Sequence, residues 1–193
     1  MWPLQKELDP VTYAPLKRLA KQLRDKDGHS HLGVCRRQRL DADGALVEDY
    51  GGWATAKQVG VPASAGVLHQ LIDEIRGHLP QTKTWDVCWW FNLLHPPGQD
   101  PQTGFVRPTG DWIQRHDHSV SHQGAGDQVV LNEWAALYYL DGAGPIVFHP
   151  DSGADMAIEA KPGLLLVFPA GLAHSVPEHK GPGRRLALAF NAR

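Results

Sequence analysis

The chain has 193 residues, of which 42% are hydrophobic, and its formal net charge at pH 7 is -2. This length suits one domain with a sizeable core, and the weak net charge argues against a strong general attraction to nucleic acid or to an acidic membrane surface. No segment approaches the ~20 apolar residues that a membrane-spanning helix needs. The 20 glycines and 15 prolines favour short strands and turns over a helical bundle.

The two cysteines, Cys35 and Cys88, lie within apolar segments, and no secretory leader pattern opens the sequence. We therefore expect reduced thiols and a cytoplasmic location. The densest basic cluster, Arg36-Arg37-Gln38-Arg39, is interpreted as the solvated edge of a strand rather than as a nucleic-acid patch.

Helical periodicity is present twice in the first part of the chain. Apolar residues recur at helical spacing over 12–24 and again over 64–79. Between these helices, 32–40 and 45–49 flank an Asp-Ala-Asp-Gly turn and predict a β-hairpin. Both helices are expected to pack on one face of a β-core.

After the second helix the pattern changes to short apolar runs separated by turn residues. The predicted strands are 85–94, 111–118, 128–140, 145–148, 156–160, 163–168 and 184–190. Seven or more strands joined by short turns are typical of a sandwich or a distorted barrel. The segments 95–110 and 119–127 are predicted to be loops near the mouth of that barrel.

Three histidines are candidate metal ligands. Side chains alternate along an extended chain, so His116 and His118 are predicted to face one way and Arg115 and Asp117 the other. Two imidazoles on one face can hold one metal ion, and a tight turn after an apolar strand delivers a third imidazole, that of His174. Asp117 is the alternative ligand to His118, if a bulge turns its carboxylate inward.

The last predicted strand opens with two arginines, of which only one can face inward. Arg185, Ala187 and Ala189 share one face, whereas Arg184 shares the other face with bulky apolar residues. A guanidinium binds a carboxylate through two parallel hydrogen bonds, and the small residues after Arg185 leave room for a bound dicarboxylate.

The order of these parts resembles the double-stranded β-helix oxygenases that use Fe(II) and 2-oxoglutarate, most closely the prolyl-hydroxylase-like branch. The resemblance covers Trp85 to Asn191 and rests on His116-x-His118, Tyr138-Tyr139, the Pro162-Gly163 turn, His174, and Arg185 eleven positions later. Family members usually carry His-x-Asp or His-x-Glu where this chain has His-x-His. The resemblance implies a mainly β, α+β fold with a jelly-roll or cupin-like core, in which 1–84 support the core of 85–193 within a single domain.

The resemblance also implies a site and a reaction. Fe(II) would be held by His116, His118 and His174, and the distal carboxylate of 2-oxoglutarate by Arg185 and Tyr139. With O2 as the second co-substrate, the implied reaction hydroxylates a C–H bond and releases succinate and CO2. The implied substrate is a small molecule, an amino acid or a peptidyl residue, for which the candidate contacts are His122, Trp53 and Phe105.

Two other functions fit the same residues. A cupin-type three-histidine dioxygenase or isomerase would use the same histidines but has no need of an arginine at position 185. A non-catalytic β-domain would bind no stoichiometric metal, and 2-oxoglutarate would not stabilise it.

Overall fold

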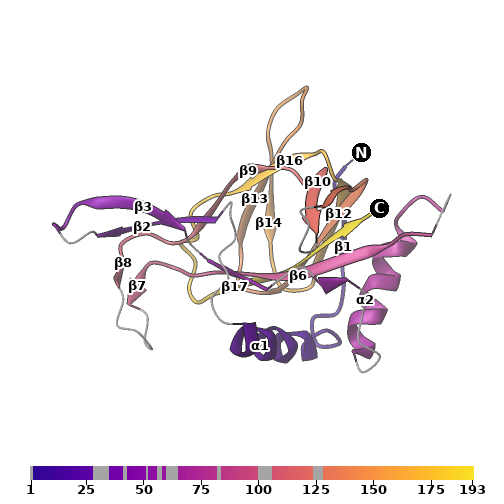
Figure 1. Cartoon of the computed structure of the whole chain (residues 1–193), viewed down its shortest axis with the longest axis horizontal. Helices are drawn as coiled ribbons and strands as arrows, with labels where there is room; N and C mark the ends of the chain where they lie inside the picture. Colours follow the sequence, from indigo (N-terminus) through magenta and orange to yellow (C-terminus); the bar gives the residue numbers. More distant parts are fainter. Residues whose placement is uncertain are drawn as a thin grey trace.

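The structure is a computed structural model that describes residues 2–27, 35–40, 43–50, 52–55, 58–59, 65–81, 84–99, 106–123 and 128–193. Its helices are α1 (Pro15–Asp27) and α2 (Gly66–Gly77) (Figure 1). Its strands are β1 (Leu4–Glu7), β2 (Cys35–Leu40), β3 (Leu46–Tyr50), β4 (Trp53–Ala54), β5 (Gln58–Val59), β6 (Val87–Leu94), β7 (Gly98–Gln99), β8 (Val106–Arg107), β9 (Trp112–His116), β10 (Val120–Gln123), β11 (Gln128–Leu131), β12 (Trp134–Asp141), β13 (Gly144–His149), β14 (Met156–Ala160), β15 (Leu164–Pro169), β16 (Ala173–Val176) and β17 (Arg185–Ala192).

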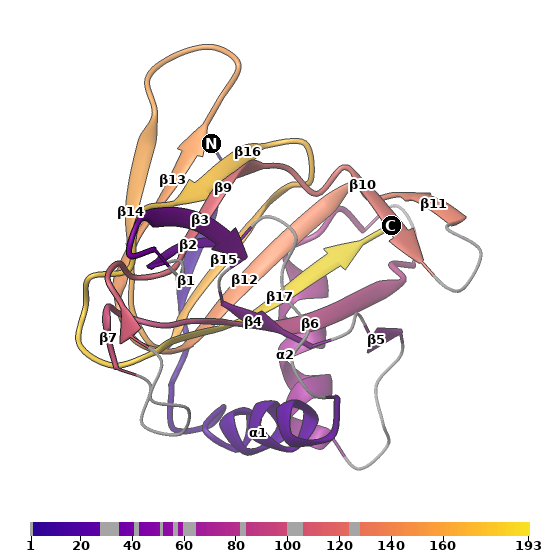
Figure 2. The same cartoon turned by 60° about the vertical axis from the view of Figure 1, so that its left-hand side comes forward.

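Two large antiparallel sheets form the body of the molecule (Figure 2). One has seven strands in the order β1-β15-β12-β17-β6-β4, with β5 also paired to β6, and the other has six in the order β14-β13-β16-β9-β2-β3. The mainly β architecture with a double-stranded β-helix core, predicted from the sequence, is confirmed. Strands from the first part of the chain enter both sheets, so 1–84 contribute β1 to β5 as well as the two helices.

The seven-stranded sheet is buried on both faces, and its strands alternate between them. On β17, Leu186, Leu188 and Phe190 belong to one apolar core with α1 and α2, and we call this the outer face. Ala187 and Ala189 point the other way, into a second core with residues of the six-stranded sheet, and we call this the inner face. A strand covered on both faces carries a continuous apolar run, as this one does from Leu186 to Phe190.

Both helices cover the outer face of the seven-stranded sheet (Figure 1). α1 begins at Pro15, a residue whose fixed backbone angle suits the first helical turn, so the helix starts three residues later than the sequence pattern predicted. α2 buries Leu68, Leu71, Ile72 and Ile75 at helical spacing, as expected. Neither of these helices, searched over the described residues, is long and apolar enough to cross a membrane.

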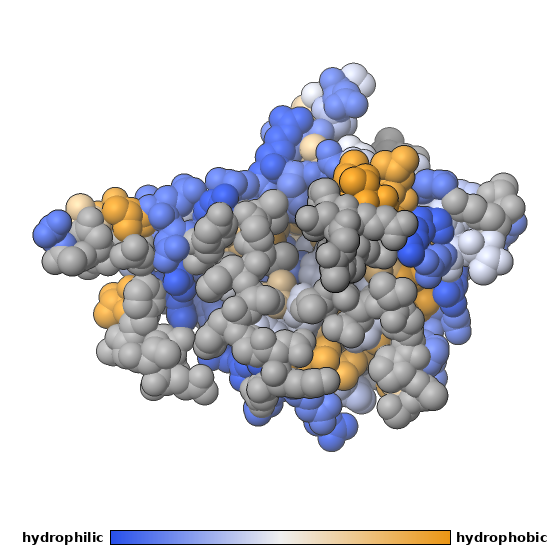
Figure 3. Space-filling model, in the orientation of Figure 1, coloured by the Kyte–Doolittle hydropathy of each residue, from blue (hydrophilic) through white to orange (hydrophobic). Residues whose placement is uncertain are grey.

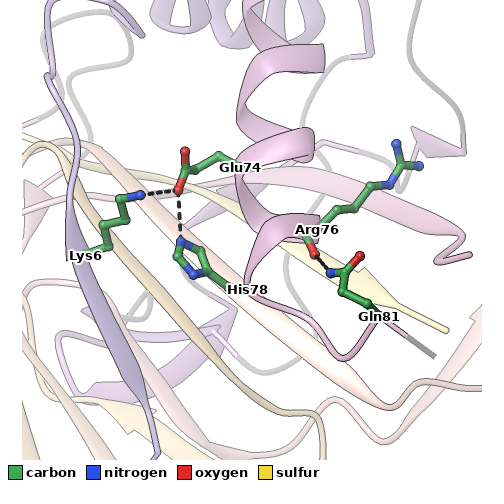
Figure 4. Close-up of polar contacts among 5 residues, drawn as sticks. All are labelled: Lys6, Glu74, Arg76, His78 and Gln81. Carbon is green, nitrogen blue, oxygen red and sulfur yellow. Dashed lines mark hydrogen bonds and ion pairs between the residues drawn. The ribbon is translucent and has the colours of Figure 1, made fainter. Parts of the chain in front are cut away.

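Polar contacts tie the end of α2 to β1 and to its own following loop (Figure 4). The carboxylate of Glu74 accepts a hydrogen bond from Lys6 Nζ, and His78 Nε2 lies 2.9 Å from the same oxygen. These neighbours, Lys6 first, lower the pKa of Glu74. Gln81 Nε2 donates to the carbonyl of Arg76 at 2.9 Å, which satisfies one of the open carbonyls at the helix end.

The hairpin predicted from 32–40 and 45–49 is β2 and β3. Across it, Arg36 Nε lies 3.1 Å from Glu48 Oε1, and Arg37 Nη2 lies 3.4 Å from Asp49 Oδ2. The basic run of β2 is therefore partly neutralised by cross-strand pairs, and β2 lies between β9 and β3 instead of at the solvated edge that the sequence predicted.

The strand predicted over 128–140 is wrong as a single element. The chain leaves β11 at Leu131 and enters β12 at Trp134, and the break is fixed by Asn132, whose amide groups bond back to Ser119 and His118. β11 pairs with β10, and β10 lies within the segment 119–127 that was predicted to be a loop. Likewise, β7 and β8 form a short hairpin within the predicted loop 95–110.

A β-bulge interrupts the pairing of β12 with β17. Tyr139 lies opposite Ala187, but Asp141 lies opposite Leu186, so two residues of β12 correspond to one of β17. Tyr139 therefore lies on the inner face with Ala187, and Asp141 lies on the outer face with Leu186.

Candidate metal and co-substrate site

The structure brings His116, His118 and His174 together, although His174 is more than fifty residues away in sequence. One ligand atom from each lies within 4.8 Å of the others, and this is the one such group among the described residues. His116 and His174 are direct cross-strand neighbours on β9 and β16, and His118 Nε2 lies 3.3 Å from His174 Nε2. Two nitrogens bound to one ion at about 2.1 Å lie about 3 to 3.4 Å apart, so this spacing fits a shared metal.

Backbone hydrogen bonds orient two of the imidazoles. His116 Nδ1 lies 2.9 Å from the carbonyl of Gln114, and His174 Nδ1 lies 3.1 Å from the carbonyl of Leu172. A carbonyl only accepts, so each Nδ1 carries the proton and each Nε2 presents its lone pair to the centre of the group.

Burial keeps these imidazoles neutral, which is the form that binds a metal. Burial lowers the pKa of His174 to about 3, and the neighbouring His116 adds to this effect. Burial also lowers the pKa of His116. Phe148, Phe168 and Trp90 surround the group, which explains why water is largely excluded from it.

His118 reaches this group by a turn and not by strand alternation. β9 ends at His116, and His118 lies in the bend that follows. Its amide donates to the carbonyl of Ala170 at 2.8 Å, and its carbonyl accepts from Asn132 Nδ2 at 2.7 Å. The sequence pattern predicts that the two imidazoles meet through strand alternation, whereas the structure brings them together through this turn.

Asp117, the alternative ligand, faces away from the histidines. Its carboxylate accepts hydrogen bonds from the hydroxyl of Ser119 at 2.6 Å and from the Ser119 amide at 2.9 Å. These bonds, led by that of the hydroxyl, lower the pKa of Asp117. The side chain is engaged in closing the turn that delivers His118, so the geometry favours three nitrogen ligands.

Arg185 is a buried cation on the inner face of β17. Its side chain donates from Nη1 to the carbonyl of Pro145 at 3.0 Å and from Nη2 to the hydroxyl of Tyr139 at 3.2 Å. Over the described part of the chain, no carboxylate forms an ion pair with it, although Arg185 is only 3% exposed. A buried charge without a counter-ion is costly, so this arrangement favours an incoming anion.

Between the arginine and the histidines, β17 presents two small side chains. Ala187 and Ala189 follow Arg185 on the inner face, and Ala189 lies opposite Trp90, whose ring is stacked on His118. The inner face of β17 thus leads from the guanidinium toward the imidazoles past side chains that occupy little space.

Two asparagines on this inner face were not identified from the sequence. Asn191 is 2% exposed, yet neither its amide nitrogen nor its oxygen has a hydrogen-bond partner among the described residues. Asn92 lies opposite Ala187, and its buried amide oxygen also has no hydrogen-bond partner among the described residues. Buried polar groups are nearly always paired, so these amides indicate a polar ligand. The signal available in the sequence was strand alternation, which puts Asn191 on the same face as Arg185.

Of the other residues that the sequence singled out, the structure places Trp53 and Arg184 outside this site. Trp53 belongs to β4, and its side chain lies on the outer face beneath α1, so its assignment as a substrate contact is corrected. Arg184 is exposed, in agreement with the expectation that only Arg185 turns inward. His122 lies in β10 opposite Val129, but its side chain, like Phe105, lies outside the described residues.

The hairpin of β10 and β11 adds an apolar surface close to the histidines in sequence. Val120, Val129 and Leu131 are exposed on one face of this hairpin, which begins two residues after His118. Figure 3 shows hydrophobic residues gathered in this region of the molecule, on a face that is otherwise mostly hydrophilic where it is coloured. An exposed apolar group of this kind is typical of a binding surface.

No family model matches the sequence, and no curated protein matches it. Among solved structures, the chain is similar to a prolyl-4-hydroxylase from Pseudomonas putida, at 20% identity and a TM-score of 0.62, covering 99% of this chain and 91% of that one. It is also similar to a viral collagen prolyl hydroxylase from Paramecium Bursaria Chlorella virus-1 in complex with 2OG, at 12% identity and a TM-score of 0.59, covering 100% and 96%. A 2OG-Fe(II) oxygenase family oxidoreductase from Burkholderia pseudomallei gives 12% identity and a TM-score of 0.58, covering 98% and 84%. The resemblance seen in the sequence is thus confirmed at the level of the fold.

Proposed function

We propose that the chain is a non-haem Fe(II) and 2-oxoglutarate-dependent oxygenase that hydroxylates a C–H bond. His116, His118 and His174 hold the metal, and Arg185 with Tyr139 holds the distal carboxylate of 2-oxoglutarate. With these groups bound, Fe(II), 2-oxoglutarate and O2 supply the oxidising chemistry that converts C–H to C–OH, with succinate and CO2 as co-products.

The observation that carries this proposal is Arg185, a buried guanidinium that pairs with no carboxylate of the described residues, on the strand face that leads to the three imidazoles. A three-histidine metal site alone serves many reactions. An uncompensated buried arginine beside such a site fits a co-substrate that has one end at the metal and a carboxylate at the other.

The residues of the chain have separate tasks in this site. The carbonyls of Gln114 and Leu172 keep two imidazoles in the tautomer that binds metal. The Pro145 carbonyl and the Tyr139 hydroxyl fix the plane of the guanidinium, so that its remaining N–H groups can take a carboxylate bidentately. Phe148 and Phe168 exclude water, which strengthens each polar interaction inside.

For the substrate, we propose an amino-acid residue or a small molecule with an apolar portion. Two of the similar structures are described as prolyl hydroxylases. The exposed Val120, Val129 and Leu131 on the hairpin after His118 support a substrate that contacts apolar surface as it enters.

The proposal is tested by the affinity of the anaerobic Fe(II) protein for 2-oxoglutarate, followed by the weak visible charge-transfer band of the chelate. Arg185→Gln removes a charge-assisted pair worth about 1.5–3 kcal/mol, so affinity is expected to fall about 10- to 150-fold while iron still binds. Arg185→Lys is expected to rescue only partly, because an ammonium lacks the planar fork.

Arg184→Gln is the matched control, since it removes the same charge from the adjacent residue on the opposite face of the strand. The affinity of the Arg184→Gln protein for 2-oxoglutarate is expected to match that of the unaltered protein. Equal affinities across all four proteins would reject the oxygenase and favour a cupin-type three-histidine enzyme, whereas a failure to bind metal at all would favour the non-catalytic β-domain.

A further inference from the structure

An amide lies in the same row of side chains as Tyr139, on the inner face of the seven-stranded sheet. Tyr139 of β12 lies opposite Ala187 of β17, which lies opposite Asn92 of β6. These three strands are consecutive in the sheet (Figure 2). Directly paired residues point to the same face, and neighbouring strands are about 4.8 Å apart. Tyr139 and Asn92 therefore flank the methyl group of Ala187, with about 10 Å between their backbones.

The two polar atoms of Asn92 lack hydrogen-bond partners. Its Oδ1 is buried and has none among the described residues. Its Nδ2 has none there either, but this atom is not buried, so it borders open space. An amide nitrogen offers two N–H donors and no acceptor. A group that fills this space and accepts hydrogen bonds is therefore complementary to Asn92.

Arg185 is a diagonal neighbour of this amide. It lies opposite Leu94, two residues beyond Asn92 on β6. Diagonal neighbours on one face are about 7–8 Å apart, which a long side chain can span. The guanidinium carbon lies 5.0 Å from the centre of the Tyr139 ring, so the cation leans toward the row that holds Asn92. Its bonds to Pro145 and Tyr139 use only part of the five N–H groups that a guanidinium offers.

An apolar residue would suit the position of Asn92 better than an amide does. Its direct neighbours, Ala54 and Ala187, belong to the apolar inner core, and Asn92 interrupts the apolar run of β6. A buried polar atom without a partner costs free energy of folding. A residue that breaks the local pattern at such a cost is typical of a binding site.

We propose that Asn92 binds the co-substrate, with Nδ2 donating to the distal carboxylate of 2-oxoglutarate from the side of the row opposite Tyr139. This inference rests on the proposed function. The carboxylate lies between the guanidinium of Arg185 and the amide of Asn92 and accepts hydrogen bonds from both. Asn92 therefore determines specificity, because its donor serves only a 2-oxo acid that carries a second carboxylate.

The test compares two ligands of the anaerobic Fe(II) protein. 2-Oxoglutarate carries the distal carboxylate, and 2-oxobutyrate has a hydrogen in its place. Asn92→Leu is expected to weaken 2-oxoglutarate binding about 10-fold and to leave the affinity for 2-oxobutyrate within about 2-fold. Its Tm is expected to stay equal or to rise, because the unpaired amide is gone. A merely structural role predicts the opposite pattern, with a lower Tm and equal losses for both acids.

A second variant tests the position of Asn92 without metal or ligand. Asn92→Asp puts a carboxylate beside the guanidinium, where the two form an ion pair. The substitution is made in the unaltered protein and in Arg185→Gln, as a double-mutant cycle. The change in Tm is expected to be more favourable by at least about 3 °C when Arg185 is present. With iron bound, Asn92→Asp is expected to weaken 2-oxoglutarate binding at least about 10-fold further than Asn92→Leu does, because like charges repel.

Three results would overturn the inference: 2-oxoglutarate binding to Asn92→Leu as tightly as to the unaltered protein, equal losses of affinity for both acids, or the same change in Tm on introducing aspartate with and without Arg185. Failure of the unaltered protein to bind 2-oxoglutarate would instead reject the proposed function, and with it the ligand assigned to Asn92. The double-mutant cycle would still decide whether the amide faces the guanidinium.

Discussion

At the scale of single residues, two of the candidate metal ligands are oriented by the partner of their other ring nitrogen. His116 and His174 each donate Nδ1–H to a backbone carbonyl, while Oδ1 of Asp117 accepts two hydrogen bonds from Ser119. The contacts of Asp117 bear on the one choice that the sequence left open, which is whether His118 or Asp117 supplies the remaining ligand.

The first prediction concerns these ligands. His116→Ala and His174→Ala are each expected to abolish stoichiometric iron binding, because two remaining imidazoles leave the ion poorly held. Asp117→Ala is expected to bind iron nearly as the unaltered protein does, and to lose only turn stability of about 1 kcal/mol. Iron content after anaerobic loading and desalting is the measurement. A folded Asp117→Ala protein without iron would transfer the ligand role to the carboxylate.

The second prediction concerns the unpaired amide of Asn191. Replacing an orphaned buried amide with an apolar side chain of similar size relieves a desolvation cost, so Asn191→Leu is expected to keep or gain stability, by about 0–2 kcal/mol. Its affinity for 2-oxoglutarate is expected to fall about 2- to 10-fold, because a hydrogen bond to the ligand is lost. Chemical unfolding and the anaerobic titration measure the two effects.

Asn132→Leu provides the matched comparison. Asn132 is also buried, but its amide donates to the carbonyl of His118 at 2.7 Å, so its loss is expected to cost about 1–3 kcal/mol of stability. If Asn191→Leu is destabilised as much as Asn132→Leu and binds 2-oxoglutarate normally, the role of Asn191 is structural.

Sequence patterns predict charged and ligating residues better than they predict neutral ones. The spacing of His174 and Arg185 was informative because histidine and arginine are rare in apolar strands. The small residues that follow Arg185 on one face of its strand added to this signal. Asn92 lies within the run Val87–Leu94, where one amide does not disturb the apolar pattern, so it was missed. Trp53 was misassigned because its glycine-rich surroundings conceal a two-residue strand that turns the indole toward α1.

At the scale of elements, the Glu74 carboxylate adds a polar contact to the apolar packing of α2 on the sheet. Lys6 of β1 and His78 both contact it, so one acidic side chain connects the helix end to an edge strand (Figure 4). The exposed fraction of the Glu74 side chain is 27%, so solvent partly screens its ion pair with Lys6.

The third prediction is the pH dependence of this contact. The pKa of Glu74 is lowered in the folded protein, so its contribution is present above the ordinary value of 4.5 and is lost as pH falls through the lower folded pKa. Glu74→Gln is expected to lose about 0.5–1 kcal/mol at neutral pH, or about 1–4 °C in Tm, and to match the unaltered protein once the carboxyl is protonated.

Thermal unfolding at several pH values measures this difference. Asp73→Asn is the control on the same helix, because Asp73 is exposed and has only the i,i+3 contact with Arg76 at 3.4 Å. A Glu74→Gln deficit that persists unchanged in acid would assign the effect to packing instead of charge.

Helix α2 was predictable because six apolar residues recur at helical spacing over four turns. β10 was not, because it is short and polar, and its pairing depends on a partner that the local pattern does not reveal. The division of 128–140 was hidden for a similar reason, since the bonds that end β11 come from His118 and Ser119.

At the scale of the whole molecule, the two halves of the proposed site lie on different sheets. His116 and His174 belong to the six-stranded sheet, whereas Arg185 and Tyr139 belong to the seven-stranded one. A co-substrate that reaches from the metal to the guanidinium would therefore connect the sheets across the inner core.

The fourth prediction follows from this bridge. Fe(II) and 2-oxoglutarate together are expected to raise the anaerobic Tm by more than the sum of their separate effects. A ligand present at about 100 times its Kd stabilises the folded protein by about 2.7 kcal/mol, which raises Tm by about 5–10 °C for a chain of this size. The excess is expected to disappear in Arg185→Gln, and also with 2-oxobutyrate, which lacks the distal carboxylate. Strictly additive shifts would mean that the ligand does not join the sheets.

The β-bulge in β12 decides which residue lies opposite Arg185. Had the pairing of Tyr139 with Ala187 continued without interruption, Asp141 would lie directly opposite Arg185 on the inner face. Its carboxylate would then neutralise the guanidinium permanently, as a tethered competitor of any dicarboxylate. The extra residue sends Asp141 to the outer face, where it meets Lys17. One irregularity in a strand thus keeps the carboxylate of Asp141 away from the guanidinium of Arg185.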